Sequence, residues 1–285
     1  MATLSIEAAL ANAIRLLGSV SDTARLDAEV LLARSIGKNR AFLRAWPERL
    51  LRAEEEQCFR AYVAQRAHGV PVAYLTGERE FWSRSFHVSP EVLIPRPETE
   101  LLVELAIEAI RRENRPRILD LGTGSGAIAV TLALECPEAE IWAVDVSEPA
   151  LAVARRNAAE LGAKAIRFLQ GYWLGPLPAN VRFDLIVSNP PYIGPADPHL
   201  LSGDVRYEPR QALVSADNGL QDITLVAESA HQALTAGGRL MFEHGYDQAA
   251  AVADILNDMG YRDIRHYRDM QGYERVTAAR RSAQD

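Results

Sequence analysis

The stretch Asp120-Leu121-Gly122-Thr123-Gly124-Ser125-Gly126 follows the apolar residues Ile118 and Leu119 and leads into the apolar run Ala127-Ile128-Ala129-Val130. A strand, a glycine loop and a helix in this order allow the backbone to turn tightly and to approach a ligand closely. Dinucleotide-binding loops have the spacing G-x-G-x-x-G, whereas this loop has G-x-G-x-G. The spacing weakens a nicotinamide interpretation and favours S-adenosylmethionine (SAM). An ordinary strand-to-helix turn is the alternative for the glycines alone.

Asp145 ends the next predicted strand, residues 140–145. A carboxylate at a strand end can accept hydrogen bonds from both hydroxyls of a ribose. An Asp after a strand is often a helix cap, but Ser147 already suits that position. Pro149 fits the first turn of the helix that follows and Gly162 fits its end. Asp145 and the glycine loop together predict a nucleotide-like cofactor site.

Apolar segments alternate with helix-compatible segments after Pro97, which predicts an α/β fold with a parallel sheet covered by helices. The last two predicted strands have no room for a helix between them and should pair antiparallel. The predicted strands are residues 117–120, 140–145, 166–169, 183–188, 238–243, 261–267 and 273–279.

The chain before this region has a different pattern. Residues 1–72 have apolar positions at helical spacing and predict a small helical domain. Residues 73–90 predict a β-hairpin linker, because aromatic and apolar side chains surround Gly77 there. Residues 91–285 are then the catalytic domain.

A second motif, Ser188-Asn189-Pro190-Pro191-Tyr192, directly follows the fourth strand. It therefore shares the carboxyl edge of the sheet with the glycine loop. A planar amide or aromatic amine is a weak nucleophile, because its nitrogen lone pair is delocalised. The side-chain oxygen of Asn189 and the carbonyl of Pro190 can accept its two N–H groups, and Tyr192 can cover one face. A rigid Pro-Pro turn with a packed Tyr is the alternative interpretation.

Charge and composition restrict the partners. The 285 residues carry a net charge of −7, of which residues 1–70 contribute +2 and the remainder −9. An acidic catalytic region disfavours direct nucleic-acid binding and accommodates a basic protein partner. No apolar run approaches the length of a membrane span and no targeting peptide is evident, so we expect a cytoplasmic protein without membrane contact. Two distant cysteines and six histidines show no metal-ligand spacing, so no metal is predicted.

Several further segments carry a resemblance to a known family. The stretch from Phe86 to Glu100, with Ile94-Pro95-Arg96-Pro97-Glu98-Thr99-Glu100 at its end, is similar to the linker and first-helix signature of the HemK/PrmC family. These bacterial enzymes methylate the glutamine of the Gly-Gly-Gln motif in peptide chain release factors. The resemblance covers nearly the whole chain. The other similar segments are Tyr207-Glu208-Pro209, Gly219-Leu220, Glu243-His244-Gly245 and Glu274-Arg275-Val276.

The resemblance implies a class I SAM-dependent methyltransferase, with a Rossmann-like seven-stranded sheet and an N-terminal domain that helps to hold the release factor. It implies methyl transfer from SAM to the glutamine N5 atom, with S-adenosylhomocysteine as product. The implied substrate contacts are Asn189, Pro190, Pro191 and Tyr192, of which Asn189, Pro190 and Tyr192 are catalytic. The implied cofactor contacts are Gly122, Thr123, Gly124, Ser125, Gly126, Asp145, Trp173 and Asn189.

One position departs from the family pattern, because Tyr172 precedes Trp173 where relatives commonly have an acidic residue. A carboxylate contact to the adenine amino group therefore does not follow, while Trp173 can stack on adenine or pack in the core. Arg96, Glu98 and Glu100 are second-tier ligand candidates, with surface ion pairs as the alternative role. His244 fits a structural hydrogen bond better than a catalytic base.

Two other functions compete. An adenine N6-methyltransferase acting on nucleic acid presents the same two N–H groups to an Asn-Pro-Pro-Tyr loop, so the motif by itself does not distinguish the substrates. The acidic catalytic region and the lack of a long insertion for base recognition argue against it. A SAM-binding scaffold without chemistry is the second alternative, and the retained Asn189 and both prolines argue against that.

Overall fold

The computed structural model describes residues 4–282. The chain divides into two compact units, the first made of Met1–Glu78 with Pro198–Tyr207 and the second of Arg79–Asp197 with Glu208–Asp285.

The first unit is a helical bundle around an aliphatic core. Ser5 caps the first helix by accepting a hydrogen bond from the Ala8 N–H, and Gly37 ends the second in the left-handed conformation. The buried side chains include Leu17, Leu31 and Phe59. The helices are α1 (Ile6–Leu17), α2 (Ala24–Ile36), α3 (Arg40–Ala45), α4 (Ala53–Ala67) and α5 (Val72–Thr76).

The short segment Pro198–Tyr207 belongs to this unit, although the sequence pattern assigned it to the catalytic domain. It contains the 3₁₀ turns η1 (Pro198–Leu201) and η2 (Val205–Tyr207). The buried guanidinium of Arg66 explains the assignment, because it bonds Asp27 at 2.7 Å and Asp204 at 2.6 Å. A buried cation is costly without partners, and two carboxylates from distant parts of the chain supply them.

The predicted hairpin is shorter than the sequence suggested. Its strands are β1 (Glu78–Phe81) and β2 (Arg84–His87), and Phe81 and Phe86 pack edge to face at 5.9 Å between ring centroids. Val72–Thr76, including Tyr74, is helical instead. Gly77, with φ of 74°, ends that helix before β1 begins. Tyr74 therefore belongs to the helix and not to the hairpin.

The second unit is built on a seven-stranded sheet with the order β5-β4-β3-β6-β7-β9-β8. Every neighbouring pair up to β7 is parallel, and β9 is antiparallel to both β7 and β8. The α/β class, the seven strands and the antiparallel final pair predicted from the sequence are confirmed. The strands are β3 (Arg117–Leu121), β4 (Glu140–Asp145), β5 (Ile166–Gln170), β6 (Phe183–Ser188), β7 (Leu234–Glu243), β8 (Arg262–Arg268) and β9 (Glu274–Arg280).

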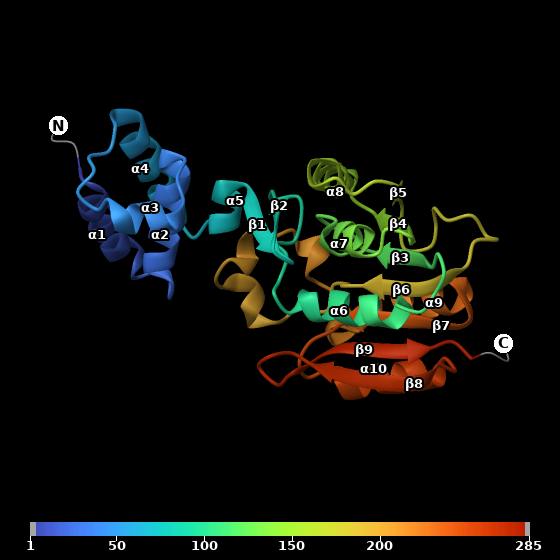
Figure 1. The fold of residues 1–285 in the computed structure, drawn as a ribbon. Helices are drawn as coiled ribbons and strands as arrows, with labels where there is room; N and C mark the ends of the chain where they lie inside the picture. The colour runs from blue at the N-terminus through green and yellow to red at the C-terminus, as the bar shows by residue number, and fades with distance from the viewer. Residues whose placement is uncertain (1–3, 283–285) are drawn as a thin grey trace. The chain divides into compact units, whose positions relative to one another are not determined.

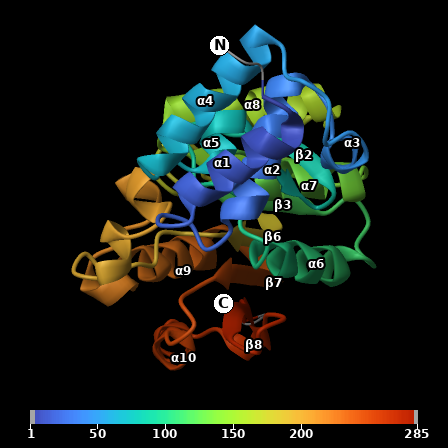
Figure 2. The same ribbon diagram turned by 90° about the vertical axis from the view of Figure 1, so that its left-hand side faces the viewer.

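Helices cover both faces of this sheet (Figure 1). Figure 2 shows β6 and β7 between α6 on one side and α9 on the other. The strand alternation accounts for the two layers, because Ile118 packs in one core cluster while Leu119 and Leu121 pack in the other. The helices are α6 (Thr99–Ile110), α7 (Ala127–Glu135), α8 (Glu148–Leu161), α9 (Gln221–Ala233) and α10 (Ala249–Asp258), with the turns η3 (Arg210–Ala212) and η4 (Asp217–Gly219) before α9.

The crossover after β4 follows its sequence signals. Ser147 accepts a hydrogen bond from the Ala150 N–H at the start of α8, and Gly162 ends the helix with φ of 77°. This predicted crossover is confirmed. It matters for the site because α8 starts at Glu148, three residues after Asp145.

Candidate active site

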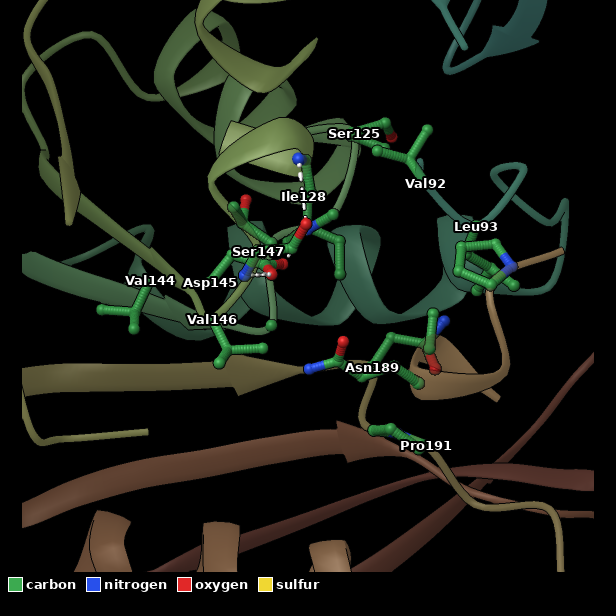
Figure 3. A pocket seen from close by; sticks show the side chains of 18 of the residues that line it. Val92, Leu93, Ser125, Ile128, Val144, Asp145, Val146, Ser147, Asn189 and Pro191 are labelled. Carbon is green, nitrogen blue, oxygen red and sulfur yellow. Dashed lines mark hydrogen bonds between the residues drawn. The ribbon is translucent and has the colours of Figure 1, made fainter. Parts of the chain in front are cut away.

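A cavity of about 350 Å³ opens at the carboxyl ends of β3, β4 and β6. The chain continues from β3 to β4 on one side, while β6 lies on the other side of β3, so the cavity lies at the switch point where open α/β sheets bind ligands. Figure 3 shows Asp145 and Asn189 on two walls of the cavity. Eight of the predicted site residues line it: Gly122, Thr123, Gly124, Ser125, Asp145, Trp173, Asn189 and Pro191.

The three glycines of the loop have different surroundings. All have positive φ, 73° at Gly122, 54° at Gly124 and 80° at Gly126. A Cβ at Gly124 would meet nothing within 4 Å, whereas one at Gly126 would lie 3.0 Å from the Cβ of Ala154. Gly126 therefore lets the loop pack closely on α8 and does not line the cavity, while Gly122 and Gly124 do.

Asp145 holds the glycine loop against the start of α8. Its Oδ2 accepts the Gly124 N–H at 2.8 Å and its Oδ1 accepts the Ser147 N–H at 2.9 Å. Burial raises the pKa of this carboxyl, and the backbone N–H bonds oppose that rise. Each oxygen has a second lone pair, so the carboxylate can accept further hydrogen bonds from a ligand.

Asn157 joins the glycine loop to the hairpin, and sequence reasoning did not identify it. Its amide nitrogen donates to the carbonyls of Ser125 at 2.8 Å and His87 at 3.0 Å, and its oxygen accepts the His87 N–H at 2.7 Å. The side chain is 1% exposed. An Asn inside a predicted helix gives no local signal for this role, because its partners are 32 and 70 residues away.

Asp120, the first residue of the quoted motif, is completely buried below the loop. Its Oδ2 accepts the Thr123 hydroxyl at 2.7 Å. Burial is the main cause that raises the pKa of Asp120 to about 7, and the Thr123 hydrogen bond opposes it. Asp120 thus supports the loop from within the sheet and does not line the cavity.

Trp173 lines the cavity beside Gly122. A Cβ added to Gly122 would lie 3.7 Å from the Trp173 ring. Its φ is 45°, an uncommon value for a bulky residue, and its buried Nε1 has no hydrogen-bond partner within residues 4–282. Tyr172 is 56% exposed, and its hydroxyl lies 3.4 Å from Oδ1 of Asp222. Sequence reasoning missed Asp222. It brings a carboxylate to the cavity lining near Tyr172, the position before Trp173 that has no acidic residue in this chain.

Asn189 projects from the end of β6, with its amide oxygen on the side of the cavity that Asp145 lines (Figure 3). Its Nδ2 donates to the Thr99 hydroxyl at 3.1 Å, and no hydrogen bond in the described part of the chain occupies its Oδ1. The Ser188 hydroxyl donates to the Leu121 carbonyl at 2.7 Å and fixes the adjacent strand ends. Pro191 lines the cavity, whereas Pro190 is buried and does not.

Tyr192 does not line the cavity, and its hydroxyl bonds a buried carboxylate. Its hydroxyl donates to Glu243 at 2.9 Å, and its carbonyl accepts from Gln248 at 3.0 Å. Gly219 packs against the same carbonyl so closely that an added Cβ would lie 2.0 Å from it. Tyr192 is therefore held at two groups, its hydroxyl and its carbonyl. The close approach to the carbonyl gives a steric reason for a glycine at position 219.

Two of the three second-tier candidates, Arg96 and Glu100, have structural partners. Arg96 lines the cavity and forms an ion pair with Glu208, whose side chain is fully buried and also accepts the Ile94 N–H at 3.0 Å. Glu100 accepts the Trp82 N–H at 2.7 Å in the hairpin. Glu98 immediately precedes α6 and makes no side-chain cap bond.

His244 is completely buried between two hydrogen-bond partners. Its Nδ1 lies 2.8 Å from the Gly245 carbonyl and its Nε2 2.8 Å from the Thr277 hydroxyl. Burial lowers the pKa of the imidazole. The residue does not line the cavity, which agrees with the structural role expected from the sequence.

Residues 4–282 lack two features. No helix there is long and apolar enough to cross a membrane. No group of three or more His, Cys, Asp or Glu side chains there could hold a metal ion.

Comparison with known proteins gives matches to both parts of the chain. Residues 8–77 match the PrmC N-terminal domain family, and residues 113–275 match a methyltransferase domain family. A release factor glutamine methyltransferase of Vibrio cholerae is 48% identical over 276 residues, which is 96% of each chain. The protein of the same name from Escherichia coli is 48% identical over 260 residues, covering 91% of this chain and 93% of that protein.

A solved structure shows the same fold. A methyltransferase from Pyrococcus furiosus has a TM-score of 0.52 and 16% identity, and the match covers 77% of this chain and 97% of that chain. At this identity the likeness concerns the arrangement of the sheet and helices alone.

Proposed function

The chain belongs to the release factor glutamine methyltransferase family, and we propose that its cavity holds SAM together with the glutamine of a release factor Gly-Gly-Gln motif. The reaction is transfer of a methyl group to the side-chain amide nitrogen of that glutamine. The observation that carries this assignment is the open amide oxygen of Asn189 on the wall of a cavity whose other wall is the glycine loop.

The cofactor half of the cavity fits SAM. Gly122 and Gly124 leave room for close approach, and Asp145 keeps lone pairs available for two ribose hydroxyls. The unpartnered Nε1 and the ring of Trp173 suit an adenine. When bound, SAM supplies an electrophilic methyl group on a sulfonium sulfur.

The acceptor half fits a planar NH₂ group. Its nitrogen lone pair is delocalised, so position and electrostatics must make it reactive. The Oδ1 of Asn189 accepts one N–H. We propose the main-chain carbonyl of Pro190 as the acceptor for the other, because Pro190 lies between Asn189 and Pro191, which both line the cavity. Two acceptors fix the plane of the group and keep its nitrogen directed at the cofactor half.

The same two oxygens also stabilise charge. Methylation leaves a positive charge on the glutamine nitrogen until its proton departs. The hydrogen bonds from its two N–H groups to the oxygens become stronger as that charge develops. These contacts are therefore stronger in the transition state than with the neutral amide, which is the condition for lowering the barrier. A catalytic base is unnecessary for this step.

A docked protein supplies orientation that a free amino acid lacks. We propose that the first unit holds the release factor, so that binding energy from remote surfaces positions the weakly nucleophilic glutamine. Free glutamine should accordingly be a poor substrate. The net charge of −9 on residues 71–285 is compatible with a basic protein surface and unfavourable for a phosphate backbone.

The test is mass spectrometry of the Gly-Gly-Gln peptide after a folded release factor has been incubated with the protein and SAM. We expect one added methyl group on that glutamine. The matched control is a release factor in which the glutamine is replaced, and it should gain none. Adenine-containing DNA is incubated in parallel. Methylated DNA beside an unmodified peptide would replace the glutamine assignment with the adenine one.

A further inference from the structure

Three hydrogen bonds connect residues 189–192, the acceptor loop, to the buried carboxylate of Glu243. Thr99 begins α6, Glu243 ends β7, and Asn189 directly follows β6. Ser188, the last residue of β6, pairs with Phe242 of β7, so Asn189 leaves the sheet beside Glu243, the last residue of β7. The sheet register and the start of α6 thus bring together residues that are up to 144 positions apart.

The distances form a continuous path. The Thr99 hydroxyl lies 2.6 Å from Oε2 of Glu243 and 3.1 Å from Nδ2 of Asn189. The Tyr192 hydroxyl lies 2.9 Å from Oε1 of the same glutamate. Glu243 is 1% exposed and Thr99 is 4% exposed, so water does not compete for these bonds.

Each hydrogen bond in this series has a defined donor and acceptor. The Thr99 and Tyr192 hydroxyls donate to the two oxygens of Glu243, Oε2 and Oε1, and in its carboxylate form that side chain only accepts. Thr99 has only one proton, and once that proton points at Glu243 its oxygen can only accept from Asn189. The amide of Asn189 must then turn its NH₂ to Thr99 and its oxygen to the cavity.

We propose that Thr99 and Glu243 are positioning residues that select the orientation of the Asn189 amide, an inference that rests on the function proposed above. The terminal torsion of an Asn has two broad wells, so the side chain alone does not choose between oxygen and nitrogen. The reversed amide would direct its own N–H at the N–H of the acceptor. Two donors facing each other cannot bond, and the acceptor nitrogen would lose its fixed position.

Burial of Glu243 supports a role beyond packing. A fully buried carboxylate costs free energy, and apolar side chains of similar volume often serve stability equally well. Burial raises the pKa of Glu243, while the hydrogen bonds from Thr99 and Tyr192 oppose that rise. The two hydroxyls thus stabilise the buried carboxylate, and the carboxylate in turn fixes where their protons point. Thr99 bonds Asn189 of the acceptor loop, and Tyr192 belongs to that loop.

The experiment compares Thr99→Val, which keeps the side-chain shape without the hydroxyl, with Thr99→Ser, which keeps the hydroxyl. The matched control is Thr131→Val in α7, because Thr131 is also completely buried but its hydroxyl has no partner within residues 4–282. Single-turnover methyl transfer at saturating SAM and calorimetric SAM affinity are measured for each full-length protein. Wild type is assayed on release factor and on DNA, and the variants on whichever acceptor it methylates.

We expect Thr99→Val to transfer methyl about 10- to 100-fold more slowly, with the SAM dissociation constant changed less than about threefold. Thr99→Ser should recover most of the rate, and Thr131→Val should behave as wild type. Glu243→Gln should also slow transfer, because an amide cannot accept both hydroxyl protons on separate oxygens.

Three outcomes would overturn the inference: an unchanged rate in Thr99→Val, an equal loss in Thr99→Ser, or a loss of SAM binding that parallels the loss of rate. Failure of the proposed function has a different signature, namely wild-type protein that methylates DNA and leaves the release factor unmodified. The rate ratio of Thr99→Val to wild type on that other acceptor still decides the role of Thr99.

Discussion

The two halves of the cavity are held by different kinds of contact. In the cofactor half, the glycine loop is fixed by its own backbone conformation and by main-chain N–H groups that bond Asp145. In the acceptor half, Asn189 and Tyr192 are fixed by side chains, through Thr99 and Glu243. Both halves lie at one sheet edge, yet one is local in the sequence and the other is assembled from distant segments.

This difference separates binding from chemistry. Backbone N–H groups form much of the cofactor half, and they stay in place when a side chain is changed to Ala, so a single such change should remove only part of the SAM affinity. The acceptor half depends on a path of single hydrogen bonds, so one change there should slow methyl transfer while leaving SAM binding nearly intact. Three substitutions test this contrast.

The largest effect is expected for Asn189→Ala. The change removes the side-chain acceptor of the reacting N–H group, and we expect single-turnover transfer to fall about 1000-fold, by analogy with loss of one charge-stabilising contact in other active sites. SAM affinity, measured by calorimetry, should weaken less than about tenfold, because most of the cofactor half is untouched. Near-normal transfer by a folded Asn189→Ala protein would remove the role assigned to this side chain.

An intermediate effect is expected for Asp145→Ala. Loss of charged hydrogen bonds should weaken SAM binding by about 1–3 kcal/mol, or roughly 5- to 150-fold. Transfer at saturating SAM should change much less than in Asn189→Ala. Calorimetric titration checks the affinity, and an unchanged dissociation constant would mean that the ribose site lies elsewhere.

The smallest effect is expected for Tyr192→Phe. The ring and its packing stay, and one hydroxyl donor to Glu243 is lost, which costs about 1 kcal/mol and corresponds to roughly fivefold slower transfer. The Thr99 bond to the same carboxylate remains to orient Asn189. A fall in the transfer rate as large as that of Asn189→Ala would show that the Tyr192 hydroxyl takes part in the chemistry. Tyr192 would then be more than a support for Asn189.

The sequence by itself determined the fold class, and it predicted the residues of the proposed cofactor half. Strand positions, the crossover after β4 and the antiparallel pair β8 and β9 follow from hydrophobic alternation, caps and connection length, which act between near neighbours in the chain. The glycine loop and Asp145 were recognisable for the same reason. Their chemistry depends on a strand end and a tight turn, which local residues encode.

Only the tertiary structure decided how the acceptor half is supported. Thr99 lay inside a recognised signature and Glu243 inside another, but their contact with Asn189 depends on the register of β6 and β7 and on the start of α6. Likewise, the assignment of Pro198–Tyr207 to the first unit depends on the buried Arg66, whose partner Asp204 is 138 residues away. Hydrogen bonds over such separations leave no local periodicity or spacing, because the atoms meet only after the sheet and the bundle have formed.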